Sequence, residues 1–104
     1  MKIFLCILFL LNAGISIATM EQQTADCFTY GAKYMGVSLN DPAPDQTDNA
    51  EDCQSFCQTV PGCGSFSWVD GNHDTEELRL LCTLWFEYDY IMVDKHYVSG
   101  PREC

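Results

Sequence analysis

The chain has 104 residues, and its fifteen acidic residues outweigh five basic ones, giving a formal charge of −10. Nucleic acids and anionic membrane surfaces are therefore poor partners, because both are bound largely through positive charge. The length suits one domain. A cationic partner or a neutral sugar remains open, although surplus acid also serves simply to keep a secreted domain soluble.

Residues 1–18 are expected to be a secretory signal peptide. Lys2 precedes the apolar run Ile3–Leu11, and the small residues Ser16 and Ala18 suit cleavage after Ala18. The run is too short for a membrane anchor, which needs about 20 apolar residues. The mature chain keeps four basic residues, so its formal charge becomes −11. We expect it to be secreted and extracellular, with residues 19–26 as a flexible leader.

Six cysteines remain after Cys6 leaves with the signal peptide, an even number that favours a complete disulfide framework in an exported chain. They are Cys27, Cys53, Cys57, Cys63, Cys82 and Cys104. A domain of this size gains only marginal stability from its core, so cross-links are expected. Spacing alone leaves all fifteen pairings of six cysteines open.

The first elements after Cys27 are expected to be strands. Phe28–Leu39 is rich in β-favouring residues but is interrupted by Gly31 and Gly36, which predicts two short strands with a turn or bulge. Asn40–Asp45 contains two prolines and is expected to be a loop.

A helix is predicted next. Asp48 is the expected cap, with Glu51 three residues later in a capping-box arrangement and Asp52 adding charge in the first turn. The apolar side chains recur at i, i+3, i+4 and i+7, so both helical cysteines should lie on one buried stripe. These positions are Cys53, Phe56, Cys57 and Val60, and Pro61-Gly62 should end the helix.

Strands should follow the helix. Gly64–Val69 predicts a strand with Phe66 and Trp68 on one face. The remaining segments are a polar excursion, an apolar run, an irregular surface loop without a clean period and a last short strand: Asp70–Glu77, Leu78–Phe86, Tyr88–His96 and Tyr97–Ser99. The sum is an α+β domain, one helix on a small antiparallel sheet.

The sequence gives little support for a metal site or a catalytic site. His73 and His96 could suggest zinc, but oxidised cysteines supply no thiolate and no paired ligand motif occurs. The acidic stretch Asp70–Asp74 lacks the spacing of a calcium loop. No nucleophile motif occurs, so we expect no cofactor, no metal and no enzyme activity.

Taken together, several motifs resemble the PAN/apple domain family. They are Cys27, Tyr34-x-Gly36-x-x-Leu39, Cys53-Gln54-x-x-Cys57, Pro61-Gly62-Cys63-x-x-Phe66-x-Trp68, Cys82-x-Leu84 and Val98-Ser99-Gly100-Pro101-x-x-Cys104. The resemblance covers residues 27–104. It implies a small disulfide-rich fold in which a five-stranded antiparallel sheet cradles one helix, with the pairing Cys27–Cys104, Cys53–Cys82 and Cys57–Cys63.

On that pairing, the bridge that joins both ends of the domain should matter most. The chain-entropy model gives about 4–5 kcal/mol for closing it, against about 2 kcal/mol for the Cys57–Cys63 loop. One departure concerns the ligand: many relatives carry a lysine soon after Cys-x-Leu, where this chain has Trp85-Phe86-Glu87.

The family resemblance implies a non-catalytic binding module for an extracellular protein or a glycan. Trp85–Tyr97 supplies aromatic faces and polar groups that suit either ligand. The candidate ligand-binding residues are Asp94, Lys95, His96, Tyr97, Tyr88 and Tyr90. The competing interpretation places Trp85, Phe86, Tyr97 and Val98 in the core and leaves the rest a solvated loop.

Two specific roles stay open beside general recognition. One is a galactose-type lectin or adhesin acting in attachment to a host or cell surface, and the other is an accessory docking module for an extracellular protease. Because one weak site rarely gives strong adhesion, we expect either self-association into a homo-oligomer or modest affinity. The sequence has no Asn-x-Ser/Thr site for N-glycosylation.

Overall fold

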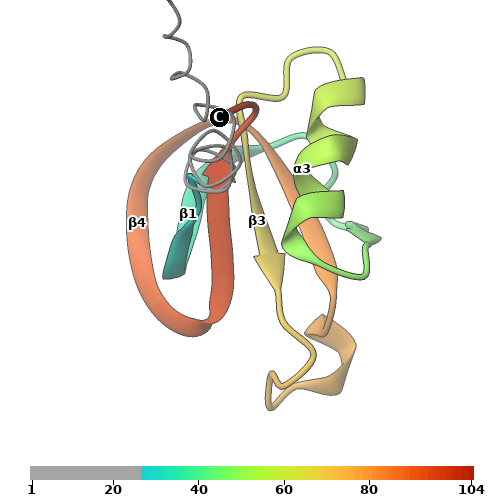
Figure 1. Cartoon of the computed structure of the whole chain (residues 1–104), viewed down its shortest axis with the longest axis vertical. Helices are drawn as coiled ribbons and strands as arrows, with labels where there is room; N and C mark the ends of the chain where they lie inside the picture. Colours follow the sequence, from blue (N-terminus) through green and yellow to red (C-terminus); the bar gives the residue numbers. More distant parts are fainter. Residues whose placement is uncertain (1–26) are drawn as a thin grey trace, which may run out of the picture.

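The computed structural model describes residues 27–104, so the expected signal peptide and leader lie outside the described residues. The elements, in chain order, are β1 (Thr29–Ser38), β2 (Asp45–Gln46), α3 (Ala50–Thr59), β3 (Ser65–Val69), a 3-10 helix (Glu76–Leu78) and β4 (Leu81–Pro101), as Figure 1 shows. No helix within residues 27–104 is long and apolar enough to cross a membrane.

The helix α3 begins one residue later than the sequence predicts. Its cap is Asn49, whose side-chain oxygen accepts a hydrogen bond from the backbone N–H of Asp52 at 2.7 Å. The Asn49 carbonyl also accepts from the N–H of Cys53 at 3.2 Å. The prediction that Asp48 caps the helix is therefore wrong. Both residues belong to the capping class, so composition alone did not separate them.

The buried face of α3 is the predicted stripe. Cys53 and Cys57 are fully buried, and Phe56 and Val60 pack against the same cluster. The helix covers β3 and the first part of β4 (Figure 1), so the core lies between helix and sheet with Phe66 at its centre. Removing these side chains from water is the main favourable contribution to folding.

Three disulfides cross-link the domain in the pairing that the family resemblance implies. Their Cα–Cα distances are 5.6 Å for Cys27–Cys104, 5.5 Å for Cys53–Cys82 and 5.5 Å for Cys57–Cys63. The first joins the two ends of the domain, the second ties α3 to β4, and the third closes the loop after α3. Together they fix the helix and both ends of the domain to one framework.

The strand β4 organises the sheet. It is 21 residues long and curves through an arch (Figure 1), so that its two ends flank β3. Phe66 of β3 pairs with Leu84 on one side and with Gly100 on the other. The partner numbers fall on both sides as the β3 numbers rise, so β3 runs opposite to both ends of β4. The strand β1 pairs antiparallel with residues 85–99 of β4.

Within residues 27–104 the sheet has four strands, and the expectation of five is wrong. Within Phe28–Leu39, residues Thr29–Ser38 form the single bulged strand β1 instead of two short strands. Tyr88–His96, expected as an irregular loop, is part of β4, which also contains the expected last strand Tyr97–Ser99. Backbone pairing with β1 holds this segment in an extended conformation. Its alternate side chains are not buried and do not contribute to this.

A buried polar network joins the three long strands. The hydroxyls of Ser67 and Ser99 lie 2.7 Å apart, and Ser99 donates to the Ala32 carbonyl at 2.7 Å. Ser67 therefore donates to Ser99, and its oxygen accepts from Trp85 Nε1 and from the Tyr34 backbone N–H, both at 3.0 Å. Each hydroxyl is fully buried and satisfied, which the cost of unpaired buried polar groups requires.

Candidate functional site

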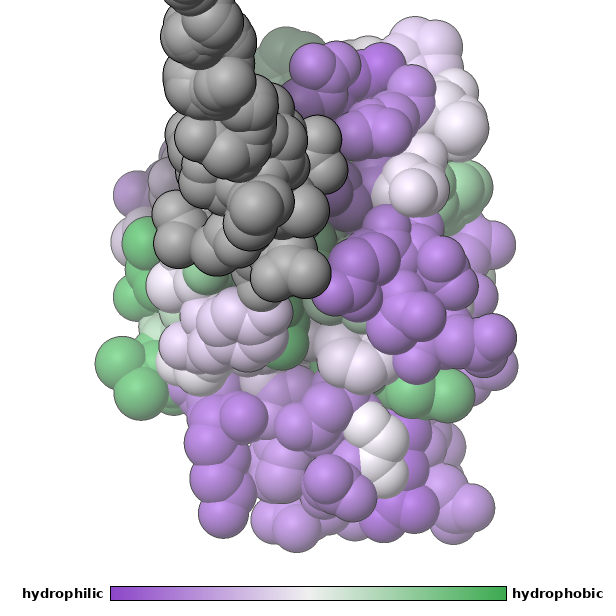
Figure 2. Space-filling model, viewed as in Figure 1, coloured by the Kyte–Doolittle hydropathy of each residue, from purple (hydrophilic) through white to green (hydrophobic). Residues whose placement is uncertain are grey.

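The most exposed apolar part of the domain is Phe86–Val93, which we call the arch strand. All eight of its side chains are exposed, although the segment is regular β-structure. The apolar and aromatic members are Phe86, Tyr88, Tyr90, Ile91, Met92 and Val93. Green atoms gather at the left margin of Figure 2, over the outer curve of β4, whereas the lower part of this face is hydrophilic. Contiguous exposed apolar surface of this kind marks interaction sites.

A bulge at Asp89 decides which side chains of the arch strand share a face. Met35 pairs with Tyr90, but its neighbour Gly36 pairs with Tyr88, so Asp89 is an extra residue. Directly paired residues lie on the same face of a sheet, and neighbours on one strand lie on opposite faces. Tyr88 and Tyr90 therefore point to opposite faces, although their spacing in sequence suggests one.

Gly36 permits the close approach of β1 to the arch strand. A Cβ atom at this position would collide with the backbone of Glu87 and Tyr88. At this approach the rings of Tyr34 and Tyr88 stack, with centroids 4.0 Å apart and planes at 18°. Tyr34 is buried by this contact while Tyr88 keeps 43% of its surface exposed. Tyr88 is therefore anchored on one side and open on the other.

Both faces of the arch strand carry apolar side chains. Tyr88, Ile91 and Val93 share one face, because their partners on β1 are Gly36, Tyr34 and Ala32. Tyr90 and Met92 lie on the other face, opposite Met35 and Lys33. A partner lying beside this strand would thus find apolar contacts above and below its own backbone.

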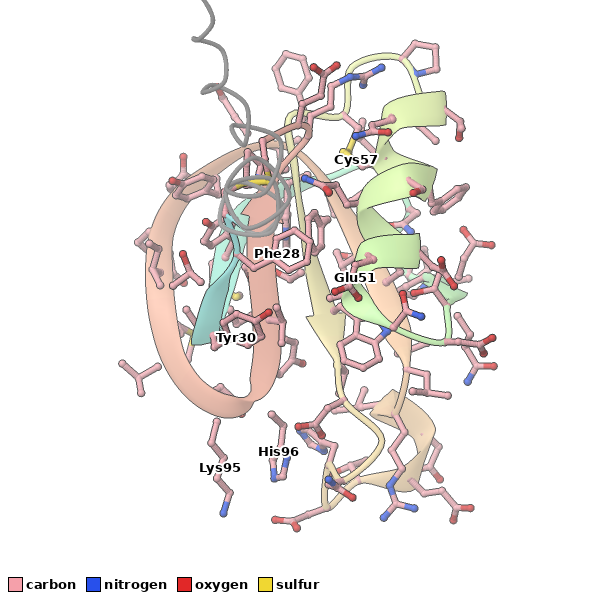
Figure 3. The ribbon with its side chains drawn as sticks, in the orientation of Figure 1. Phe28, Tyr30, Glu51, Cys57, Lys95 and His96 are labelled. Atoms are coloured by element: carbon pink, nitrogen blue, oxygen red, sulfur yellow. A yellow bond between two sulfur atoms is a disulfide. The ribbon has the colours of Figure 1, made fainter. Side chains whose placement is uncertain are left out.

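The four candidate residues Asp94–Tyr97 lie within β4 directly after the arch strand, at a register shift that we call the turn. β1 pairs with Val93 before this turn and with Val98 after it, and only Gly31 lies between the two partners on β1. Gly31 has φ +77°, a left-handed conformation that glycine adopts without steric cost. Figure 3 shows Lys95 and His96 at the lower end of the domain, with Lys95 pointing away from it.

His96 joins this turn to the polar excursion after β3. Its Nδ1 lies 3.1 Å from Asp70 Oδ1, and its backbone N–H donates to Asp94 Oδ1 at 3.0 Å. The backbone N–H of Asp70 donates to the His96 carbonyl at 2.8 Å. The His73 ring lies 5.1 Å from the His96 ring, centroid to centroid. Two imidazoles and two carboxylates therefore meet at this turn.

Tyr97, the last residue of the turn, pairs with Val69 of β3 and is only 6% exposed. The Lys33 ammonium sits over its ring at 5.0 Å from the centroid, and the His73 ring meets it edge-on at 6.2 Å. A cation over the ring is a favourable contact. The Tyr97 ring is therefore already in contact with this chain's own groups, and the Lys95 ammonium is the open polar group of the turn.

The structure brings some predicted site residues together and separates others. Asp94, His96 and Tyr97 meet at the turn, Lys95 points outward, and Tyr88 and Tyr90 lie on opposite faces of the arch strand. Of the residues assigned to the core by the competing interpretation, Trp85 and Tyr97 are buried and Val98 is partly buried. Phe86 is 55% exposed, so that part of the interpretation is wrong.

Sequence reasoning missed several contributors to this surface. Asp70, His73 and Lys33 reach the turn from other strands and loops, and no spacing signal connects them with residues 94–97. Ile91, Met92 and Val93 do carry a signal, a β-branched and apolar run next to the candidate tyrosines, although the lack of a clean period favours a loop. Within residues 27–104 the structure shows no group of three His, Cys, Asp or Glu side chains placed to hold a metal ion.

Comparison with protein families decides the classification. The family model described as the PAN domain matches residues 27–91, which is more than half of the chain. The chain belongs to the PAN domain family. PAN domains are generally non-catalytic modules that bind proteins or carbohydrates, and disulfide-rich PAN domains are typical of extracellular proteins. The matched residues end inside the arch strand.

No curated protein matches this chain, so no relative names the ligand of this PAN domain. The part of the chain that the structure describes agrees with the family assignment in its one α-helix, its small antiparallel sheet and its three disulfides. The ligand has to be inferred from the surface of this PAN domain itself.

Proposed function

We propose that the protein is a secreted PAN domain that recognises an extracellular protein through the arch strand. The observation that carries the proposal is the run of eight exposed residues in regular β-structure, six of them apolar or aromatic. Solvent-exposed strands normally alternate apolar and polar side chains, so apolar side chains on both faces need another explanation. A partner that covers the strand supplies it.

The kind of side chain also favours a protein partner. Tyr88, Tyr90 and Met92 belong to residue types that are enriched in protein interfaces. Tyrosine loses little conformational entropy when it is covered and often dominates binding energy. Tyr88 is already held by stacking on Tyr34, so part of that ordering precedes binding. The arch strand is therefore suited to an apolar contact with polar rims.

Carbohydrate recognition is the second candidate, and the turn supports it. Lys95 is exposed, and the partly exposed Asp94 carboxylate offers a further polar group for sugar hydroxyls, whereas the His96 ring is mostly buried against Asp70. An aromatic platform for the sugar would have to come from elsewhere, because Tyr97 is buried beneath Lys33. The larger exposed aromatic surface lies on the arch strand, so we place protein recognition first. Docking to an extracellular protease is one form of that recognition.

The test compares two variants on two arrays, one of extracellular proteins and one of glycans. We expect the mature, oxidised protein to bind a protein saturably, and the double variant Tyr90→Ser/Ile91→Ser to bind it at least 10-fold more weakly. Leu39→Ser is the matched control, because it also removes an exposed apolar side chain but lies outside the arch strand. Its affinity should stay within 2-fold.

If the protein binds a glycan saturably, and this binding is lost in Lys95→Ala but kept in Tyr90→Ser/Ile91→Ser (the arch double variant), the binding site is the turn. Equal losses in the arch double variant and in Leu39→Ser would also contradict the proposal, because the surface would then have no preferred region.

A further inference from the structure

One edge of the arch strand carries no partner strand within the described residues. Residues 87–93 pair with β1 along a single edge. β3 pairs only with residues 82–85 and 97–101 of β4, and β2 only with residues 81–82. In a strand, alternate residues direct their backbone N–H and C=O groups to opposite edges. When only one edge is paired, half of the residues therefore leave these groups on the other edge. These groups form a template for another extended chain.

Protein edges of this kind are usually protected, and this one has little protection. Lysine, proline or inward-pointing charge are the common devices against pairing with another chain. Between Phe86 and Asp94 there is no lysine, arginine or proline. The bulge at Asp89 and the carboxylates of Glu87 and Asp89 are the protective features of this segment, and they leave the stretch from Tyr90 to Val93 regular and uncharged.

The charges within the arch strand are both negative, and the exposed Lys95 lies one residue beyond Asp94. Glu87 and Asp89 lie within the arch strand and Asp94 follows it, while Lys33 on β1 is turned toward Tyr97. A second copy of the chain would bring the same acidic residues to the edge, and like charges placed opposite each other in a sheet are destabilising. The formal charge of −10 adds to this repulsion. An extended segment with basic residues would instead be attracted.

We propose that the free edge of residues 87–93 binds an extended, lysine- or arginine-bearing segment of the partner protein by strand addition. This inference rests on the proposed function and specifies how the arch strand makes contact. Main-chain hydrogen bonds supply the pairing. Tyr88 and Ile91 on one face, and Tyr90 and Met92 on the other, contact the alternating side chains of the added strand. The acidic residues select the sign of its charge.

The experiment is a titration of the mature, ¹⁵N-labelled protein followed by amide chemical shifts. The probe is a seven-residue peptide of alternating lysine and valine. One control replaces lysine with glutamate. A second control keeps the lysine and valine side chains but carries N-methyl groups on alternate amides of the edge that would pair, which removes hydrogen-bond donors without changing charge. We expect saturable shifts confined to residues 86–94 for the probe, and at least 10-fold weaker binding of both controls.

Variants of the protein test the role of charge. Glu87→Lys/Asp89→Lys should weaken binding of the lysine–valine peptide at least 10-fold and strengthen binding of the glutamate–valine peptide. Asp74→Lys/Glu77→Lys makes the same charge change in the polar excursion after β3, where both residues are exposed. Its affinity should change less than 3-fold. Unchanged amide spectra outside the substituted sites verify that each variant is folded.

Three results would overturn the inference. They are equal binding of the N-methylated peptide, shifts outside residues 86–94, and no saturable shift up to about 5 mM peptide, which corresponds to a binding free energy of about −3 kcal/mol. A concentration-dependent dimer through residues 87–93 in sedimentation would assign the edge to a second copy instead. The array measurement is independent: if the arch double variant loses its protein partner while the N-methylated peptide binds normally, the proposed function stands and strand addition fails.

Discussion

Arg102 provides the sharpest prediction about stability, because it holds the C-terminal end of α3 from the far end of the chain. Its Nη1 donates to the carbonyls of Cys57, Val60 and Cys63 at 3.1, 3.0 and 2.9 Å. Its Nη2 donates to the Gln58 carbonyl at 2.8 Å. The last turn of α3 contains no basic residue of its own. The guanidinium therefore adds a donor to the Cys57 and Val60 carbonyls, which already accept from backbone N–H groups, and supplies one to the Gln58 carbonyl at the helix end, where its charge is also favourable.

Replacing Arg102 with methionine keeps much of the apolar stem and removes all four bonds. Hydrogen bonds to charged groups are worth about 1.5–3 kcal/mol each when buried, but Arg102 is only partly buried and water replaces part of them. We expect a total loss of about 2–3 kcal/mol in the free energy of unfolding. For a domain of this size, that corresponds to a fall of about 10–20 °C in Tm.

The assay is calorimetry and urea unfolding of the oxidised protein. Arg102→Lys should recover less than half of the loss, because an ammonium keeps the charge but lacks the planar fork of five donors. Arg79→Met is the matched control, since Arg79 Nε makes one bond, to the His73 carbonyl. It should cost about 1 kcal/mol or less. A Tm for Arg102→Met within about 2 °C of the parent, which corresponds to less than 0.5 kcal/mol, would refute the reasoning.

Three further predictions concern the framework. Replacing Cys27 and Cys104 together with serine should lower the unfolding free energy by about 4 kcal/mol, because their sequence separation is 77 residues, and an unchanged urea midpoint would contradict this. Gly36→Ala should push β1 away from the arch strand and cost about 1–3 kcal/mol. Amide hydrogen exchange in the arch strand should be faster in Gly36→Ala than in the unsubstituted protein, and equal exchange rates would count against the prediction. Asn49→Ala should cost about 1 kcal/mol and Asp48→Ala less than half of that. Equal thermal shifts in the two variants would show that the cap is assigned wrongly.

The predictable part of the fold is the part that buries a regular pattern. Cys53 and Cys57 on one helical stripe, and the strand around Phe66, followed directly from periodicity. The disulfide pairing came from the family resemblance, because spacing leaves fifteen pairings open. The predicted cap is off by one residue because Asp and Asn are about equally favoured at the cap position.

The arch strand escaped prediction for a physical reason. Alternation of apolar and polar residues reveals a strand only when one of its faces is buried. Residues 86–93 are exposed on both faces, and their backbone pairing with β1 leaves no such pattern in the sequence. The bulge at Asp89 also breaks the alternation, so Tyr88 and Tyr90 do not share a face as their spacing suggests. The partners of His96 at the turn, Asp70 and His73, come from a separate loop. Only tertiary structure brings them there.

The most direct test of the central claim is amide hydrogen exchange of the mature protein, measured with and without the extracellular protein that it binds on the array. We predict that exchange of residues 86–93 slows at least 10-fold in the complex, while exchange on α3 changes little. Unchanged exchange in residues 86–93, with protection appearing instead at residues 94–97 or on α3, would contradict the claim that the arch strand is the recognition surface.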